Sequence, residues 1–320
     1  MNGSPVLRAA VWGKEKRDAD DTMPARVTDN LFSGSRWSVE SGVRIVVCMS
    51  PAVFTSQDVG RELNTRRIGR RIVVLGETTS TNDEVLSVFE QGAPDGLVVF
   101  ADYQTRGRGR LGRPWASPRG ASVLCSILLI ERSGTRSAPI EAGTLTLAAG
   151  VAVCGAISAT AADIEPAIRW PNDVLIGGKK VAGILIESRL RRDERAYIMG
   201  IGINCLQHRG HFDDGLRVSA TSLEVESRFP VHRVALARQL LRELDRWLAD
   251  PPDGHQLRRA WLDRAEPLGQ HIELREAGEE FVGRTVDVDP TAGLVVQLDG
   301  GGRRVFDPAT STVLRIGRRG

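Results

Sequence analysis

The chain has 320 residues, enough for two domains with buried cores. Its formal net charge of +3 is too small to indicate a nucleic-acid or membrane partner by itself. We expect no transmembrane helix, because no stretch has the ~18 consecutive apolar residues that one needs, and no secretory signal, because Met1 to Ala10 lacks a basic start and an apolar core. The four cysteines lie far apart and form no CxxC pair. The sequence therefore predicts a cytoplasmic protein with free thiols and no zinc site.

Residues 1–60 differ in character from the rest of the chain. Proline and glycine interrupt every candidate element, the run from Lys16 to Asp21 is purely charged, and only Arg44 to Met49 has the character of a strand. A helix-turn-helix domain would need three amphipathic helices, and that periodicity is absent. We expect this segment to be disordered, or to lie upstream of the true start codon, and we expect no DNA-binding domain.

From about residue 61 to 266, apolar runs of strand length are mixed with helical patterns, and a tight hairpin is predicted around Gly177-Gly178. Strands are expected at Arg71 to Leu75, Leu97 to Ala101, Val123 to Ile130, Ile168 to Trp170, Asp173 to Ile176, Lys180 to Glu187 and Arg195 to Ile203. Helices are expected at Ile140 to Thr160, Val234 to Leu248 and Gln256 to Arg264. A further helix opens at Ser80-Thr81-Asn82, whose residue types favour N-capping and whose free N–H groups could also face an anionic or ureido-type ligand.

Residues 267–320 show short strands separated by glycine turns, without a helix between them. This pattern predicts a small β-barrel. An oligonucleotide-binding barrel would fit the pattern as well. Its strands would need a stacking platform, however, and here they carry one aromatic pair, Phe281 and Phe306.

The most distinctive stretch is the Arg/Gly loop, Tyr103 to Trp115, which contains four arginines and three glycines between two predicted strands. Its glycines allow the backbone to approach a ligand closely. Its guanidinium groups can form paired hydrogen bonds with phosphate or carboxylate oxygens. Alone, such a tract could also be a solvated basic loop or a single nucleic-acid contact.

The loop resembles the glycine-arginine signature of the biotin–protein ligases, and further blocks of that family occur in the expected order. They are Ser80-Thr81-Asn82, Arg169-Trp170-Pro171-Asn172-Asp173, Lys180 to Leu185 and Gly200 to Asn204. The resemblance covers about residues 63–316 and is to the monofunctional type that lacks a DNA-binding domain. It implies an α+β fold, with a mixed β-sheet catalytic domain of the class II synthetase-like biotin/lipoate ligase type over residues 61–266. A C-terminal SH3-like small β-barrel is implied over residues 267–320.

The resemblance implies an ATP-dependent ligation in two steps. The carboxylate of biotin attacks the α-phosphate of ATP to give biotinyl-5′-adenylate and pyrophosphate. A lysine of the biotin carboxyl carrier domain of a biotin-dependent carboxylase then attacks the mixed anhydride. Two anions meet in the first step, so arginine, lysine and Mg²⁺ are needed, and the Mg²⁺ is expected to arrive with ATP rather than in a dedicated protein cluster. No DNA or membrane partner is expected, and a homodimer is compatible with the resemblance.

The site residues follow from the matched blocks. The catalytic residues are expected to be Arg108, Arg110, Asp173 and Lys180. Biotin is expected to contact Ser80, Thr81, Asn82, Gln104, Arg108, Gly109, Arg110, Lys180, Gly183 and Gly202. ATP is expected to contact Arg108, Arg110, Arg113, Trp115, Asn172, Lys180 and Asn204.

Particular chemistry is expected at several of these positions. Lys180 would place a point charge at the bond-forming centre, while Lys179 faces the opposite side of the strand. Gln104 could pair with the polar edge of biotin, and Gly183 and Gly202 would leave room for its bicyclic ring. Trp115 would stack on adenine in preference to packing in the core. Asn172 would bind the nucleotide, and Asp173 would orient or deprotonate the carrier lysine, although both could simply form a turn. The family usually has lysine where this chain has Arg169, which leaves the role of that arginine open.

Two other functions share part of this pattern. A lipoate or octanoate–protein ligase would have the same catalytic architecture, but the Gly-Arg-Gly-Arg tract followed by Trp-Pro-Asn-Asp favours biotin. A biotin-sensing transcriptional repressor would need the DNA-binding helices that residues 1–60 do not show.

Overall fold

The computed structural model describes residues 54–132, 141–212, 219–250 and 253–317, together with the backbone of two strands nearer the N-terminus. Its contacts divide the chain into two units, Met1–Val53 and Phe54–Gly320. In the first unit, β1 (Arg36–Glu40) and β2 (Val43–Val47) form an antiparallel pair. β2 overlaps the segment in which a strand was expected, and it belongs to this two-stranded sheet. Most of the expectation for residues 1–60 lies outside the described residues.

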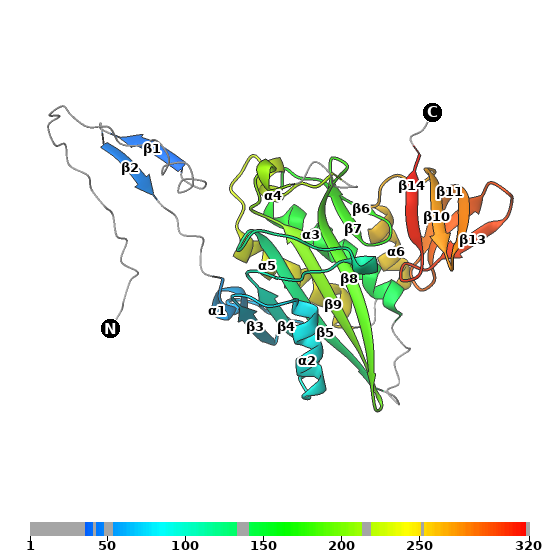
Figure 1. The fold of residues 1–320 in the computed structure, drawn as a ribbon, viewed down its shortest axis with the longest axis horizontal. Helices are drawn as coiled ribbons and strands as arrows, with labels where there is room; N and C mark the ends of the chain where they lie inside the picture. The colour runs from blue at the N-terminus through cyan, green and yellow to red at the C-terminus, as the bar shows by residue number, and fades with distance from the viewer. Residues whose placement is uncertain are drawn as a thin grey trace. The chain divides into compact units, whose positions relative to one another are not determined.

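A seven-stranded mixed sheet forms the centre of the second unit, in the order β3-β4-β5-β9-β8-β7-β6 (Figure 1). β3 and β4 run parallel, and the other neighbouring pairs are antiparallel. The strands are β3 (Arg71–Leu75), β4 (Leu97–Ala101), β5 (Ser122–Arg132), β6 (Pro166–Arg169), β7 (Asp173–Ile176), β8 (Lys179–Arg191) and β9 (Glu194–Asn204). The hairpin between β7 and β8 turns at Gly177 and Gly178, both with positive φ, as predicted. The mixed α+β fold is thus confirmed.

The two faces of this sheet have different partners, because successive side chains of a strand point to opposite sides. On β4, Val98 and Phe100 join the larger core with α3 and α5, while Leu97 and Val99 pack with α2. The helices are α1 (Ser56–Gly60), α2 (Thr81–Glu90), α3 (Ala142–Thr160), α4 (Leu223–Glu226), α5 (Arg233–Leu248) and α6 (Gly254–Leu262), with 3₁₀ turns η1 (Arg110–Gly112) and η2 (Arg209–His211). The α2 face also carries the site.

Helix α3 corrects one expectation. It has 19 residues and is apolar enough, by length and composition alone, to cross a membrane. The sequence interpretation had expected no such segment. However, 78% of its most apolar window is buried inside the protein, where α3 packs against α5, β6 and β8. A helix that is apolar on all sides and enclosed by other elements is typical of a protein core.

The C-terminal part is a second, five-stranded antiparallel sheet in the order β13-β12-β11-β10-β14. Its strands are β10 (His271–Glu276), β11 (Glu279–Asp289), β12 (Gly293–Leu298), β13 (Arg303–Phe306) and β14 (Thr312–Ile316). The architecture agrees with the expected SH3-like barrel. Phe281 and Phe306 pack edge to face in it, with ring centroids 5.3 Å apart. Arg258 of α6 forms a bidentate ion pair with Asp287 of β11, so side chains link the barrel to the rest of the unit.

Candidate active site

A cavity of about 770 Å³ opens on the α2 face of the large sheet. Its floor includes Gly183 of β8 with Gly200 and Gly202 of β9, and β14 of the barrel lines another side. The positively charged residues that line it are Arg108, Arg110, Arg113, Arg169, Lys180 and Arg315. Among the described residues, Asp173 is the one carboxylate in the lining. Such an excess of cations favours anionic ligands.

The N-terminus of α2 reaches this cavity. Ser80 occupies the N-cap position, but its side chain makes no capping hydrogen bond. Ser80 lines the cavity and is buried, so capping does not account for its hydroxyl. Thr81 does not line the cavity: its backbone N–H and its hydroxyl both lie within hydrogen-bond distance of Gln104 Oε1, at 2.7 and 3.0 Å. The structure therefore separates the two: Ser80 faces the cavity, whereas Thr81 lies behind Gln104.

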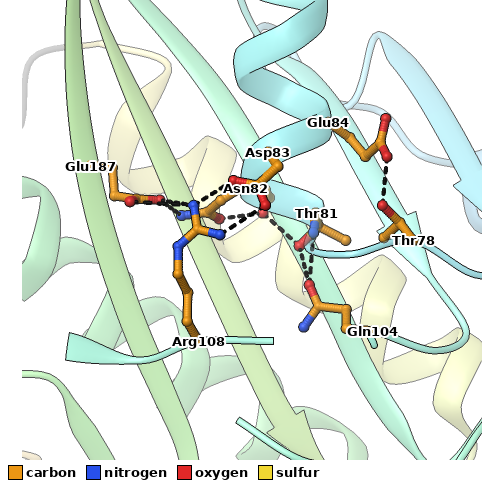
Figure 2. A network of polar contacts seen from close by, with 9 residues as sticks. Thr78, Thr81, Asn82, Asp83, Glu84, Gln104, Arg108 and Glu187 are labelled. Atoms are coloured by element: carbon orange, nitrogen blue, oxygen red, sulfur yellow. Dashed lines mark hydrogen bonds and ion pairs between the residues drawn. The ribbon is translucent and has the colours of Figure 1, made fainter. Parts of the chain in front are cut away.

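Thr81 also determines the orientation of the Gln104 amide. A backbone N–H can only donate, so the Gln104 atom that it contacts must be the oxygen. The amide nitrogen then points away from Thr81 (Figure 2). Because Gln104 lines the cavity, its amide offers N–H donors there rather than both a donor and an acceptor. Gln104 was expected to pair with biotin through both a donor and an acceptor. In this structure only its N–H groups are available to a ligand.

The side chain of Asn82 is occupied by the protein itself. Its Nδ2 donates to Glu187 Oε2 at 2.5 Å (Figure 2). Its Oδ1 accepts from the buried Ser126 hydroxyl at 2.5 Å. Sequence reasoning did not identify Glu187 or Ser126 as part of the site. Strand alternation could have found Glu187, since it lies two and four residues after Leu185 and Gly183 on the same face of β8.

Arg108 lies at the same cluster. Its guanidinium forms a bidentate pair with Asp83, at 2.6 and 2.9 Å, and a further contact with Glu187 at 3.1 Å (Figure 2). Hydrogen bonding to Asp83, followed by the nearby charge of Glu187, raises the pKa of Arg108 above its usual value. In this structure two carboxylates offset its charge. Its expected contacts with biotin and ATP stay predictions.

Arg110 has different partners. It donates to the backbone carbonyls of Ser311 and Ala309, at 2.7 and 3.3 Å, in the turn before β14. Burial lowers the pKa of Arg110. Neither Arg110 nor the exposed Arg113 forms an ion pair with any described residue. These two arginines therefore supply positive charge to the cavity that is not offset by a direct carboxylate partner.

Backbone hydrogen bonds hold the Arg/Gly loop in its shape. Gly109 N–H donates to Arg113 O at 2.7 Å, and Trp115 N–H donates to Gly107 O at 2.9 Å. The N–H of Gly109 is thus used within the loop, so its expected contact with biotin would have to come through other atoms. Leu111, between these hydrogen bonds, has φ of +57° and is 70% exposed. A non-glycine residue in the left-handed region is a strained position in a loop of this kind.

Trp115 occupies the space above the glycine floor. A Cβ on Gly202 would lie 2.5 Å from its indole ring, and a Cβ on Gly183 would lie 3.0 Å from it. The two glycines were expected to leave room for the ring of biotin, whereas here they admit the indole. Trp115 Nε1 is buried without a hydrogen-bond partner among the described residues. Lys180 Nζ lies 5.5 Å from the ring centroid. Adenine stacking by Trp115 stays a prediction.

The two lysines at the start of β8 go to different partners, as strand alternation predicts. Lys180 Nζ lies 2.5 Å from Asp173 Oδ1 at the cavity, and Lys179 Nζ donates to Glu226 at 2.6 Å outside it. The backbone of Lys180 is also held on both sides, because its N–H donates to Ser219 O and its carbonyl accepts from Thr221 N–H. These contacts keep Lys180 at the cavity.

The remaining polar residues of the matched blocks are partly structural. Asn172 Nδ2 donates to Ile184 O at 2.7 Å. Asn204 is buried, and its amide both donates to Thr221 O and accepts from Gln207 Nε2, at 2.9 Å each. Both asparagines line the cavity, but the two polar atoms of Asn204 are already in use. Their expected contacts with ATP stay predictions.

Arg169 forms a bidentate pair with Glu266, with both distances 2.8 Å. Hydrogen bonding to Glu266 raises the pKa of Arg169. Glu266 comes just before the C-terminal barrel, so the pair joins the end of β6 to the junction of the two sheets. Only a planar guanidinium can make both hydrogen bonds at once, which gives a physical reason for arginine at this position.

No group of three or more His, Cys, Asp or Glu side chains that could hold a metal ion is found in residues 54–132, 141–212, 219–250 and 253–317. In that part of the chain the cavity lining offers a single carboxylate, Asp173. Mg²⁺ usually keeps several waters and binds proteins through one or two carboxylates together with substrate phosphates. The residues present therefore fit a Mg²⁺ ion that is carried mainly by a nucleotide.

A mixed sheet with a cationic cavity beside an Arg/Gly loop, followed by a small barrel, defines the architecture of an acyl-activating protein ligase. The model of the Biotin/lipoate A/B protein ligase family matches residues 75–204. The chain is 34% identical over 269 residues to a biotin–[acetyl-CoA-carboxylase] ligase of Mycobacterium tuberculosis, covering 79% of this chain and 94% of the relative. It is 31% identical over 268 residues to a bifunctional ligase/repressor of Bacillus spizizenii, covering 83% and 80%.

A solved structure agrees with these relatives at the level of the fold. It is the biotin protein ligase of Aquifex aeolicus in complex with biotin and ATP, with a TM-score of 0.63, 24% identity, and coverage of 77% of this chain and 99% of that one. The chain belongs to the biotin/lipoate protein ligase family, on its biotin–protein ligase branch. The expected family, fold and class of enzyme are confirmed.

Proposed function

We propose that this protein activates biotin with ATP as biotinyl-5′-adenylate and transfers it to a lysine of a biotin carboxyl carrier domain. The observation that carries the proposal is the cavity itself, in which six cationic side chains face one carboxylate beside a polar pocket at the N-terminus of α2. The names of the relatives, biotin–[acetyl-CoA-carboxylase] ligases among them, point to the same activity.

In the first step, a carboxylate oxygen of biotin forms a bond to the α-phosphorus of ATP, and pyrophosphate leaves. Both reactants are anions, so the main task of the protein is electrostatic. Lys180 is the best placed cation, because its backbone is held on both sides and its side chain lies at the glycine floor. Arg110 and Arg113 add charge for the phosphates. Mg²⁺ would come with ATP, held by the phosphates and at most by Asp173 on the protein, and would neutralise phosphate charge when bound.

In the second step, the amine of the carrier lysine forms a bond to the acyl carbon, AMP leaves, and the amine gives up a proton. Asp173 is the carboxylate available at the cavity to orient that amine or accept its proton. It is paired with Lys180, so these roles require the ammonium of Lys180 to turn toward the α-phosphate. When Lys180 turns from Asp173 to the α-phosphate in the first step, it would free Asp173 for the carrier amine in the second step.

The polar pocket favours biotin over lipoate. Ser80 and Gln104 present a hydroxyl and amide N–H groups, which match the ureido oxygen of biotin. The dithiolane ring of lipoate would leave the buried Ser80 hydroxyl and the half-buried Gln104 amide without partners, and sites built around hydrogen bonds reject such analogues strongly. We therefore assign the biotin reaction rather than the lipoate one.

We further propose that the protein is a ligase without a repressor function, and that it works in the cytoplasm. The alternative, a ligase that is also a repressor, is supported by a relative that is named as a bifunctional ligase/repressor. Against it stands the absence of helical periodicity in the sequence of residues 1–60. The cytoplasmic assignment rests on the use of ATP and on the free thiols of Cys125, Cys154 and Cys205.

A direct test uses α-labelled ATP with biotin or lipoate and an unmodified carrier domain. We expect labelled adenylate and carrier modification with biotin, and neither with lipoate. Equal modification by lipoate would reject the substrate assignment. Binding of the protein to double-stranded DNA in low salt, strengthened by biotin, would reject the assignment as a ligase only.

A further inference from the structure

A chain of polar contacts runs beside the cavity from β8 to the Arg/Gly loop, and Figure 2 shows its labelled members Glu187, Asn82, Thr81 and Gln104. It begins at Glu187 and passes through Asn82 and Ser126 to Thr81 and Gln104. The contact distances along it are 2.5, 2.5, 2.7 and 3.0 Å. Glu187 also contacts Arg108, so one carboxylate meets two residues of the expected biotin site.

The chemistry of these side chains determines which group donates and which accepts in each of these hydrogen bonds. A carboxylate can only accept, so Asn82 must turn its NH₂ group to Glu187 and its oxygen to Ser126. The oxygen of Asn82 has no proton, so the Ser126 hydroxyl must donate to it. Ser126 can then only accept from Thr81, whose hydroxyl proton is thereby taken away from Gln104. The charge of Glu187 thus determines the proton order as far as Thr81, whose backbone N–H in turn orients the amide of Gln104.

Asn82 lines the cavity, but the same geometry leaves its side-chain amide no free polar atom for a ligand. Its side chain is almost fully buried, at 3% exposure, and both polar atoms have partners within the protein. The amide therefore holds α2 against β8 at the helix end that carries Ser80. Gly200 permits this approach, because a Cβ there would lie 2.3 Å from Asn82 Oδ1.

We propose that Asn82 and Glu187 are a pair of positioning residues that shape the biotin pocket through Ser126, Thr81 and Arg108, and that the polar atoms of Asn82 bond to the protein and not to biotin. The proposal rests on the proposed function. It departs from the expectation that Asn82 contacts biotin directly, and it assigns a role to Glu187 and Ser126, which no sequence motif indicated.

The test exchanges the two side chains. In Asn82→Asp, two carboxylates would face each other at the position of a 2.5 Å contact, and in Glu187→Gln the acceptor-only group is lost. In the double variant, the new amide at position 187 donates to the new carboxylate at position 82. That carboxylate still accepts from Ser126, so the order of the chain is restored. We expect each single change to raise KM for biotin by about tenfold or more, the usual effect of losing a hydrogen bond to a charged group. KM for ATP and kcat at saturating biotin should stay within about threefold.

The double variant should return KM for biotin to within about threefold of the wild-type value. If its KM is no better than that of the worse single variant, the pair does not act as proposed and a direct contact of Asn82 is favoured. Ser126→Ala provides a second, independent variant, because Ser126 is fully buried and does not line the cavity. It should also raise KM for biotin, and an unchanged KM would overturn the proposal.

Two controls separate this result from other failures. Glu280→Gln removes an exposed ion pair with Arg275 in the barrel and should leave every kinetic constant unchanged. Thermal unfolding of each variant shows whether it folds. If single variants do not fold, restored unfolding temperature in the double variant supports the pair, and additive losses reject it. A wild-type protein that forms no adenylate from biotin would instead refute the proposed function.

Discussion

The ammonium of Lys180 lies 2.5 Å from the carboxylate of Asp173, at the floor of a cavity with many cations and this single acidic side chain in its described lining. The adjacent Lys179 forms a pair of similar length, 2.6 Å, with Glu226 but lies outside the cavity. Two neighbouring lysines thus have the same kind of partner and differ in location. This difference allows the role of charge at the reaction centre to be tested with an internal control.

Lys180→Ala should lower the rate of biotin adenylation by about 10²–10³, the typical loss when one preorganised electrostatic group is removed. Biotin-dependent exchange of pyrophosphate into ATP measures this step. Lys179→Ala also removes one ion pair, yet it should keep the rate within about twofold. Near wild-type exchange in Lys180→Ala would exclude the assignment.

Arg110→Gly should release the intermediate. The change removes an uncompensated charge beside the cavity and the two hydrogen bonds to the Ala309 and Ser311 carbonyls, which connect the Arg/Gly loop with the barrel. We expect free biotinyl-adenylate to dissociate about tenfold faster or more, since hydrogen bonds from charged groups contribute ~1.5–3 kcal/mol. Filtration of labelled adenylate measures the dissociation. Arg106→Gly is the matched control, because that exposed arginine does not line the cavity; equal release from both variants would refute the idea.

Gly202→Ala should disturb the packing of the Trp115 indole ring against β9. The new methyl group would lie 2.5 Å from the indole, so the ring or the strand must shift, at a cost of about 1–3 kcal/mol. Thermal unfolding should show a lower midpoint, and Trp115→Phe in the same chain should recover part of the loss because the smaller ring leaves room. Gly254→Ala meets nothing within 4 Å and should not destabilise the protein. A Gly202→Ala protein as stable as the wild type would show that the indole moves freely.

Arg169→Lys should destabilise the junction between the two sheets by about 1 kcal/mol, because an ammonium cannot replace the paired hydrogen bonds to Glu266. The comparison is Arg258→Lys, which breaks an equally bidentate pair with Asp287. That pair is 43% and 34% exposed, against 23% and 21% for Arg169 and Glu266, so water screens it more. Denaturant unfolding should give the larger loss for Arg169→Lys; the reverse order would contradict the role of burial.

Removal of residues 1–48 should leave activity and thermal stability unchanged. A chain that starts at Met49 keeps Phe54, whose ring lies 5.1 Å from Phe100, and the fully buried Val59 of α1. A chain that starts at Leu63 loses both, and each buried apolar side chain contributes about 1.5–3 kcal/mol. Only the shorter chain should therefore melt at lower temperature. If the chain that starts at Met49 also melts several degrees lower, then residues before it stabilise the folded unit.

The sequence by itself determined most of the strands, the longer helices and the residue types that line the cavity. Apolar runs of strand length located β3, β4 and β7 to within a few residues, and the glycine turns after residue 267 indicated a barrel of short strands. The Gly177-Gly178 turn could be predicted because both positions require positive φ. The order of the motifs was enough to indicate the family. The alternation of side chains along β8 was also enough to predict that Lys179 and Lys180 lie on opposite faces of the strand.

Only the tertiary structure decided which polar groups meet. Asn82 and Glu187 are 105 residues apart, and Arg110 and Ser311 are 201 apart, so no local period links them. The same holds for Trp115 above Gly183 and Gly202, where two glycines that could have admitted a ligand ring admit a side chain instead. Periodicity records which face of an element is apolar, whereas hydrogen-bond partners depend on the register and packing of distant strands. For that reason the sequence indicated candidate residues, all of which except Thr81 line the cavity, but it could not show which of their polar groups bond to other parts of the chain.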